Sequence, residues 1–184
     1  MAVAAFQVFE TSFGRCAMLW RGALIVRILL PTETEESLRA AVMRTEIDIE
    51  ESAPPAPVAS VAAKIAAFCR GEAQDFAPAP LDRSLIDPFA ARVYAALDKV
   101  GFGETTTYGA IAETLGDRSL SRAVGAALGA NPFPIVIPCH RVTAANGTMG
   151  GFSAPGGVGT KRRLLEIEGA FAAERLPLFG QHHG

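Results

Sequence analysis

The chain has 184 residues, of which 49% are hydrophobic and 20% charged, and its formal net charge is −2 at pH 7. This length can bury a core as one ordinary domain or two small ones, and the composition excludes intrinsic disorder. No apolar run reaches the roughly 18 residues that a membrane span needs, and no basic patch precedes apolar residues at the start. We therefore expect neither a membrane segment nor a signal peptide.

Three cysteines, Cys16, Cys69 and Cys139, lack the CxxC spacing of paired ligands. An uneven number without that spacing argues against a disulfide framework and against a cysteine zinc module, so we expect a reducing, cytoplasmic setting. The charge is unevenly divided, because residues 1–88 carry eight Lys and Arg against twelve Asp and Glu, whereas residues 89–184 carry nine against seven. This surplus of positive charge is a weak indication that a polyanion would bind the second half.

The first half predicts a small antiparallel sheet followed by helices. Short apolar runs between turn residues predict strands at residues 6–10, 16–20 and 23–30. Helical spacing of apolar side chains then predicts helices at residues 34–45 and 58–70, with an Ala- and Pro-rich loop at 52–57 between them. A connection punctuated by Pro and Asp, residues 78–88, is the best candidate for a domain boundary.

The second half predicts helices. Apolar residues at helical spacing indicate a helix over residues 89–100, and a short helix is expected at 107–115. After the turn Gly116-Asp117-Arg118, Ser119 can cap another helix that runs to about Leu128. Two short helices joined by a tight turn form the helix-turn-helix pattern, which alone is a weak sign of DNA binding because many helical proteins contain it.

The second of these two helices consists almost entirely of small residues, including Gly125, which costs a helix about 1 kcal/mol. Close packing between helices would explain this composition. So would a need to enter a narrow space, such as the minor groove of B-DNA, which is about 6 Å wide.

A stiff segment leads to the third cysteine. Pro132, Pro134 and Pro138 fix backbone torsions around the apolar run before Cys139. A lone buried cysteine is usually a small hydrophobic residue, which is our interpretation of the other two. Cys139 differs because His140 follows it, and an imidazole can activate a thiol directly or through a water. Adjacent side chains on an extended backbone point to opposite sides, which favours the water. The local pattern leaves a catalytic and a structural cysteine about equally supported.

The segment Pro138-Cys139-His140-Arg141, preceded by Asn131-Pro132, resembles the active-site signature of the O6-alkylguanine-DNA alkyltransferases, also called methylated-DNA–protein-cysteine methyltransferases. Further segments resemble the opening of that family's helix-turn-helix, its recognition helix and its C-terminal part, namely residues 103–108, 122–125, 151–153 and 164–169. The resemblance is specific from about residue 85 to 170 and loose before that.

The resemblance implies a fold and an activity. The fold would be an α/β N-terminal supporting domain, residues 1–84, followed by a mainly helical domain, residues 85–184, with a winged-helix-like helix-turn-helix that carries the Pro-Cys-His-Arg motif. The activity would be irreversible transfer of a methyl or other alkyl group from O6 of guanine in duplex DNA to Cys139, with O4 of thymine as a further candidate donor. Transfer would follow minor-groove binding and nucleotide flipping, would need no cofactor, and would be carried out once by each monomer.

The resemblance also implies catalytic roles. Cys139 would be the nucleophile and alkyl acceptor, and His140 would act as its base through a water. Glu168 would orient and polarise that imidazole, which extends the logic of nucleophile, base and orienting group. Asn131 would be the hinge residue that holds the turn before the active-site strand.

The residues implied for DNA and base binding surround this relay. Tyr108 would assist rotation of the nucleotide and donate a hydrogen bond to the flipped guanine, while Arg122 would take its place in the base stack. Ser153 would donate toward the alkylated oxygen, and the backbone carbonyls of Cys139 and Val142 would accept the guanine amino group. The remaining residues assigned to DNA or base binding are Arg141, Ala123 and Gly125.

Two features depart from the family pattern. Some members have Tyr-Ser-Gly-Gly around the serine that corresponds to Ser153. Here Phe152 stands before that serine and Ala154 and Pro155 follow it, which bears on how well the site tolerates larger alkyl groups. Some members hold a structural zinc through Cys and His, but the only histidines here outside the motif are His182 and His183. We therefore expect no metal site.

Three alternative classes fit less well. A non-catalytic relative that only marks lesions would lack the cysteine, which Cys139 contradicts. A helix-turn-helix transcription regulator usually reads the major groove with long polar side chains, whereas this helix offers small residues and one arginine. A cysteine hydrolase would need an oxyanion hole and a route for deacylation, and the sequence suggests neither.

Overall fold

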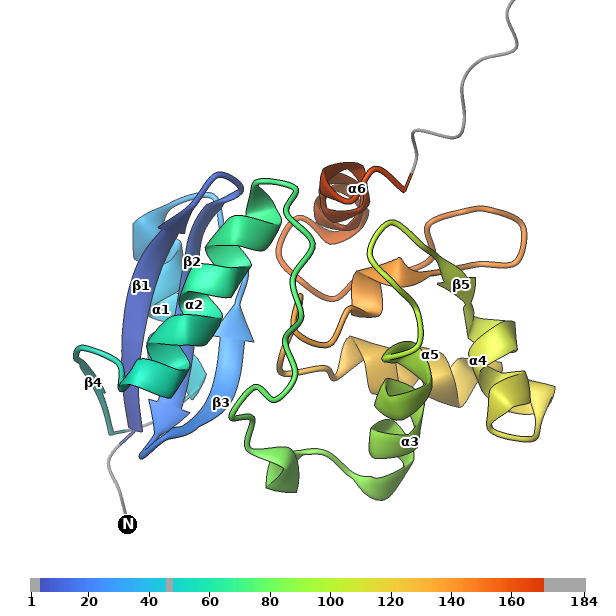
Figure 1. Ribbon diagram of the computed structural model, residues 1–184, viewed down its shortest axis with the longest axis horizontal. Helices are drawn as coiled ribbons and strands as arrows, with labels where there is room; N and C mark the ends of the chain where they lie inside the picture. The colour runs from blue at the N-terminus through green and yellow to red at the C-terminus, as the bar shows by residue number, and fades with distance from the viewer. Residues whose placement is uncertain (1–3, 46–47, 171–184) are drawn as a thin grey trace, which may run out of the picture.

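The computed structural model describes residues 4–45 and 48–170, so His182 and His183 lie outside the described residues. Figure 1 shows a sheet with one helix on each face in the first half and a group of short helices beside it in the second. No helix in the described part of the chain is long and apolar enough to cross a membrane.

The sheet has the strand order β3-β2-β1-β4. Strands β1 (Ala4–Thr11), β2 (Gly14–Arg21) and β3 (Leu24–Leu29) form an antiparallel meander, as predicted. A fourth strand that was not predicted, β4 (Ile49–Glu51), pairs in parallel with β1 and makes the sheet mixed. This three-residue strand has one apolar side chain and two glutamates, so it lacks the alternation that indicates a strand.

Strand β2 is buried on both faces, which explains its continuous apolar run. Cys16, Met18 and Trp20 belong to the main core beneath α2 (Ala56–Cys69). The alternate residues Ala17 and Leu19 pack with α1 (Glu35–Thr45) in a smaller core on the opposite face. The period of two along the strand therefore determines which helix each side chain meets.

The helix-turn-helix consists of α4 (Tyr108–Thr114) and α5 (Ser121–Gly129), with a 3-10 turn, η2 (Arg118–Leu120), between them. Thr107 caps α4 by accepting a hydrogen bond from the Ala110 N–H. The prediction that Ser119 caps the second helix was wrong, because the Asp117 carboxylate accepts from the Ser119 N–H and caps the 3-10 turn instead. The extra turn delays the start of α5.

Two further helices frame this pair. Helix α3 (Pro88–Leu97) begins where the Asp87 carboxylate accepts hydrogen bonds from the first free N–H groups, and it packs against α5. Helix α6 (Gly157–Ile167) packs against the active-site segment η3 (Cys139–Arg141). The short strands β5 (Thr106–Thr107) and β6 (Val142–Thr143) pair in parallel and join the start of α4 to the end of that segment.

The main core continues from the sheet into the second half. Residues of β2, β3 and α2 share one apolar cluster with residues of α3, α5 and the segment before Cys139. Main-chain hydrogen bonds also cross, with the Ile28 N–H donating to the Pro132 carbonyl at 2.9 Å. The predicted boundary at residues 84 and 85 falls in a 3-10 turn, η1 (Arg83–Leu85), and the division into domains stays a prediction.

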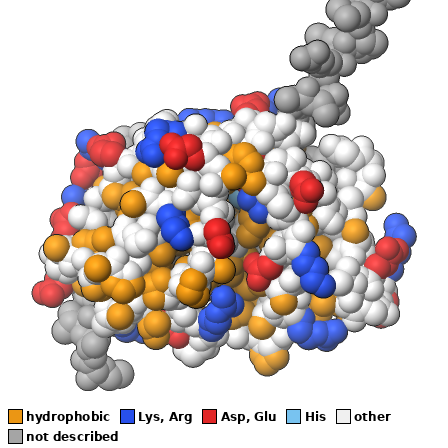
Figure 2. Space-filling view, in the orientation of Figure 1, with side chains coloured by type: hydrophobic (Ala, Val, Ile, Leu, Met, Phe, Trp, Pro, Cys, Tyr) orange, Lys and Arg blue, Asp and Glu red, His pale blue; other side chains and the backbone are white. Residues whose placement is uncertain are grey.

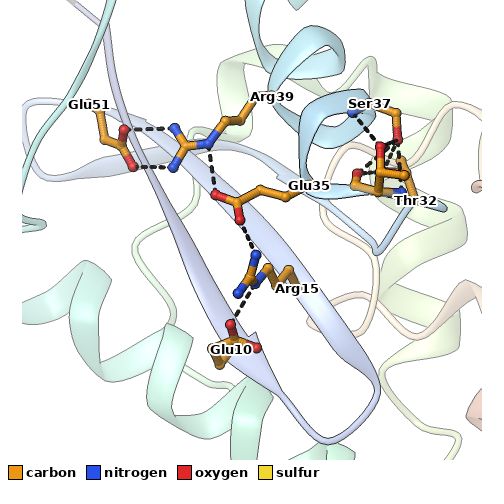
Figure 3. A network of polar contacts seen from close by, with 8 residues as sticks. Glu10, Arg15, Thr32, Glu35, Ser37, Arg39 and Glu51 are labelled. Atoms are coloured by element: carbon orange, nitrogen blue, oxygen red, sulfur yellow. Dashed lines mark hydrogen bonds and ion pairs between the residues drawn. The ribbon is translucent and has the colours of Figure 1, made fainter.

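The outer face of the sheet half carries an exposed chain of ion pairs that joins the β1–β2 hairpin to α1 and β4 (Figure 3). Its members alternate in charge, in the order Glu10, Arg15, Glu35, Arg39 and Glu51. Figure 2 shows acidic and basic side chains interspersed over the face that carries α2. Exposed pairs of this kind each contribute at most about 1 kcal/mol, so the apolar cores supply most of the stability.

Candidate active site

The backbone before Cys139 is held by Asn131. Its amide donates to the Ile137 carbonyl at 2.9 Å and accepts from the Phe133 N–H at 2.9 Å, so one side chain closes the loop between them. Ile135 sits inside this loop at a φ of 71°, which is strained for a β-branched residue. Such strain persists only where surrounding structure enforces it, and here it fixes the approach to the cysteine.

A cavity of about 500 Å³ opens at Cys139, between the helix-turn-helix and the segment of residues 150–155 that forms its lip. The cysteine is 8% exposed. Five of the predicted site residues line this cavity, namely Cys139, Tyr108, Arg122, Gly125 and Ser153. The structure therefore brings together residues that are up to 45 positions apart in the chain.

The residue after the cysteine, His140, forms a fully buried pair with Glu168. The imidazole Nε2 lies 2.6 Å from a Glu168 carboxylate oxygen, and neither side chain is exposed. The carboxylate also accepts from the Gly103 N–H at 2.8 Å and from Arg141 Nε at 3.0 Å. The other imidazole nitrogen, Nδ1, is the one buried side-chain nitrogen or oxygen of the described residues without a hydrogen-bond partner.

The pKa shifts at the site follow from burial and from these contacts. Burial raises the pKa of the Cys139 thiol, against the opposing effects of a hydrogen bond from Asn131 and the charge of Lys161. Burial lowers the pKa of His140, although Glu168 opposes that shift. Burial alone would raise the pKa of Glu168, but the hydrogen bond and charge of His140, together with hydrogen bonds from Arg141 and the Gly103 N–H, bring it below its usual value. At neutral pH the site thus holds a thiol, a neutral imidazole and a carboxylate.

Tyr108 stands at the wall of the cavity as a hydrogen-bond donor. Burial, followed by the charge of Cys139, raises the pKa of its phenol, so the hydroxyl keeps its proton at neutral pH. Its ring packs closely against Gly150, where a Cβ atom would lie 2.8 Å from the phenol oxygen.

Several predicted binding groups already have partners. The Ser153 hydroxyl donates to the Gly129 carbonyl at 2.8 Å, so in this structure its hydrogen points to the end of α5 instead of into the cavity. The Val142 carbonyl accepts from Lys161, and the Cys139 carbonyl accepts from the Val142 N–H. A carbonyl oxygen has two lone pairs, so each of these two keeps one for a further donor.

The remaining predicted residues lie apart from the cavity. Arg141 does not line it, because its guanidinium is bound to Glu168 and donates to the Val100 carbonyl at 2.6 Å. Its position is that of a support for Glu168, and this placement does not favour the predicted contact with DNA. Ala123 is exposed on α5 next to Arg122, which makes no hydrogen bond or ion pair with the described residues.

Two residues of the site were missed by the sequence analysis. Lys161 on α6 is fully buried, and its ammonium donates to three carbonyls, one in β6 and two at the start of the lip. The signal was present, because Lys161 lies at helical spacing with Leu164, Leu165 and Glu168, which are all buried. Gly150 has a φ of 67° and lacks the Cβ atom that would collide with the phenol of Tyr108. A single sequence carries no signal for that contact.

Comparison with known proteins agrees with this geometry. Residues 88–170 match the family model described as 6-O-methylguanine DNA methyltransferase, DNA binding domain. A methylated-DNA–protein-cysteine methyltransferase of Mycobacterium tuberculosis is 32% identical over 174 residues, which is 95% of this chain and 98% of that one. The crystal structure of Mycobacterium tuberculosis OGT in complex with DNA has a TM-score of 0.71 and 31% identity, covering 89% of this chain and 92% of that chain. A DNA base-flipping protein of Thermus thermophilus is 45% identical over 107 residues, 58% of this chain and 69% of that one.

Fold and site together define a helix-turn-helix protein that carries a buried cysteine beside a histidine–glutamate pair. The chain belongs to the methylated-DNA–protein-cysteine methyltransferase family.

Proposed function

We propose that this protein repairs DNA by direct reversal, moving an alkyl group from O6 of guanine in duplex DNA to the Sγ atom of its own Cys139. The observation that carries the proposal is the position of Cys139, which lines a cavity beside the helix-turn-helix and directly precedes His140, the partner of Glu168. The substrate is duplex DNA that contains O6-alkylguanine. Because Cys139, His140 and Glu168 come from one chain, a monomer suffices for the reaction.

The relay explains how a protonated thiol reacts. A buried polar atom needs a partner, and a water between His140 Nδ1 and the cysteine would provide one. The thiol proton passes through that water to the imidazole, and Glu168 stabilises the imidazolium that forms. The sulfur lone pair then attacks the alkyl carbon, and the carbon–O6 bond breaks with its electron pair going to the guanine. Tyr108 donates a hydrogen bond to the leaving base, and the proton taken up by the imidazole returns through water to that base, which leaves unmodified guanine and a neutral imidazole.

Substrate access requires a flipped nucleotide, because a base inside the duplex cannot present O6 to a buried sulfur. Flipping costs a few kcal/mol. Arg122 is exposed at the start of α5 and free of partners among the described residues, so it can enter the vacated place in the stack. The exposed residues Ala123 and Ala126 leave the same face of the helix narrow enough for the minor groove.

The product is a thioether, which is a poor leaving group, and the site offers no second nucleophile among the described residues. Transfer is therefore irreversible, and each molecule acts once.

The first experiment measures intact-protein mass after incubation with a short duplex containing one O6-methylguanine. We expect a gain of one methylene mass per molecule, mapped to Cys139 and absent in Cys139→Ala, while Cys69→Ala still gains it. Lesion-selective binding without a mass gain would place the chain among damage-marking proteins. Neither binding nor mass gain would leave the hydrolase alternative to be tested with thioester substrates.

A second experiment tests the relay. In Glu168→Gln the imidazolium loses its carboxylate partner, and we expect the single-turnover rate constant to fall by about 100-fold, within the usual range for acid–base catalysis. The matched control is Glu166→Gln, which removes an exposed carboxylate from the same turn of α6. Equal rate constants for the two variants would contradict the relay.

A further inference from the structure

Helix α6 buries a positive charge next to the reactive cysteine. Lys161 is 0% exposed, and its Nζ atom donates to the carbonyls of Val142 and Met149, both at 2.5 Å, and lies 3.5 Å from that of Gly151. None of the ion pairs among the described residues includes Lys161. A buried ammonium without a carboxylate costs considerable desolvation energy, so the fold retains it at a cost to stability.

The three carbonyls belong to two different walls of the site. Val142 begins β6, directly after the active-site segment, and its carbonyl is one of the two proposed acceptors for the guanine amino group. Met149 and Gly151 flank Gly150 at the start of the lip. One ammonium therefore connects β6, on the side of the site proposed to bind the base, with the lip. A neutral side chain with a single donor could not hold three acceptors at once.

The same ammonium faces the reacting groups. It lies 5.7 Å from the centre of the Tyr108 ring, within the range of a cation–π contact. Its charge favours ionisation of the Cys139 thiol, and Tyr108 packs on Gly150 between two of the clamped carbonyls.

We propose that Lys161 is a positioning residue of the transfer reaction, which holds the lip and β6 at the spacing that a flipped guanine needs and favours the cysteine thiolate with its charge. This inference rests on the proposed function. It implies that the protonated form of Lys161 is required for transfer, because an uncharged amine has only two hydrogens and no charge to offer Cys139.

The titration of the site allows that requirement to be observed. The titratable groups that face Lys161 are Cys139 and His140 of the active-site segment and Tyr108 of α4. Burial lowers the pKa of Lys161 to about 8, while the pKa values of Cys139 and Tyr108 are raised and that of His140 is lowered. Between about pH 7 and about pH 9, Lys161 is then the member of this group that changes charge.

The experiment measures single-turnover methyl transfer from a duplex containing one O6-methylguanine, at saturating DNA, from about pH 6 to about pH 10. For the wild-type protein we expect the rate constant to fall as Lys161 loses its proton near pH 8. In Lys161→Arg the guanidinium stays charged, so the fall should disappear from this range. In Lys161→Met the rate constant should be lower by more than about tenfold at pH 7 and show no fall near pH 8.

The control is Lys64→Met, because the partly exposed Lys64 of α2 also donates from its ammonium to a carbonyl, that of Asp75 at 2.6 Å. We expect Lys64→Met to keep the wild-type rate constant and pH profile. Thermal unfolding separates folding from positioning: a folded Lys161→Met that transfers at the wild-type rate overturns the proposal. If neither Lys161 variant folds, the pH profile of the wild-type protein tests the proposal alone. A wild-type rate constant that keeps rising through pH 9 would then overturn the proposal. No transfer by the wild-type protein at any pH would overturn the proposed function itself, and this inference with it.

Discussion

Burial raises the pKa of Cys139 and lowers the pKa of His140. The protonated thiol therefore needs a base, and the neutral imidazole can act as one. The thiol keeps its proton because its pKa is raised, while the imidazole stays free to accept one because its pKa is lowered. A cysteine alone in this pocket would be inert, like the buried Cys16, whose pKa is raised by burial well above that of an ordinary thiol.

The same burial makes folding sensitive to acid. The folded-state pKa of His140 lies below its ordinary value of 6.5, so the unfolded chain binds that proton first. The free energy of unfolding should therefore decrease as the pH falls below about 6.5. It should decrease again below about 4.5, because the lowered pKa of Glu168 means that the unfolded chain also binds this proton first. Urea unfolding at a series of pH values measures this.

The acid-sensitivity experiment needs a variant without the imidazole. His140→Asn, which cannot be protonated, should lose less unfolding free energy than the wild-type protein between about pH 7 and about pH 5. A parallel decline in both proteins over that range would show that other groups cause it.

Gly150 offers a test of how closely Tyr108 is held. In Gly150→Ala the new Cβ atom would lie 2.8 Å from the phenol oxygen, so Tyr108 must move and the transfer rate constant should fall by about tenfold or more. Gly147→Ala is the matched control, because its backbone also has a positive φ, of 76°, but its Cβ atom would meet nothing within 4 Å. Both variants carry the same kind of backbone strain. A rate constant that falls equally in both would attribute the effect to loop strain instead of Tyr108.

At the scale of elements, the helix-turn-helix was accessible from sequence because its signals are local. Turn residues and helical spacing placed both helices, and only the cap was misassigned, since Asp117 is as good a cap as Ser119 and lies two residues earlier. Strand β4 could not be predicted, because its pairing with β1 depends on a partner about 45 residues away. The site behaves likewise: the motif indicates Cys139 and His140, whereas the clamp of Lys161 on the lip depends on how α6 packs.

The small residues of α5 make a prediction about DNA binding. Ala126 is exposed on that helix, and Ala126→Leu adds bulk where the proposed fit to the minor groove allows little. We expect the dissociation constant for duplex DNA to rise by about tenfold, which corresponds to roughly 1.4 kcal/mol. Ala95→Leu adds the same bulk at an exposed position of α3 and should leave the affinity unchanged. Equal affinities for the two variants, measured by fluorescence anisotropy, would contradict the proposal that α5 enters the minor groove.

On the scale of the whole molecule, the charge separates along the chain. The acidic first half forms the sheet with its exposed ion pairs, and the more basic second half carries the cavity and Arg122, which has no partner among the described residues. The two halves contact each other through the Ile28–Pro132 hydrogen bond and through Arg163 of α6, whose guanidinium lies 4.4 Å from the centre of the Phe13 ring.

The continuous core predicts that both halves unfold together. Trp20, the only tryptophan, is 4% exposed in β2 and reports on the sheet, as do Cys16 and Cys69. Cys139 reports on the second half. Because one apolar cluster contains all four residues, pulsed thiol labelling in urea should modify the three cysteines at the same midpoint at which Trp20 fluorescence changes. If Cys139 is labelled at a clearly different urea concentration from Cys16 and Cys69, the halves unfold separately, and the boundary predicted at residues 84 and 85 divides two independent domains.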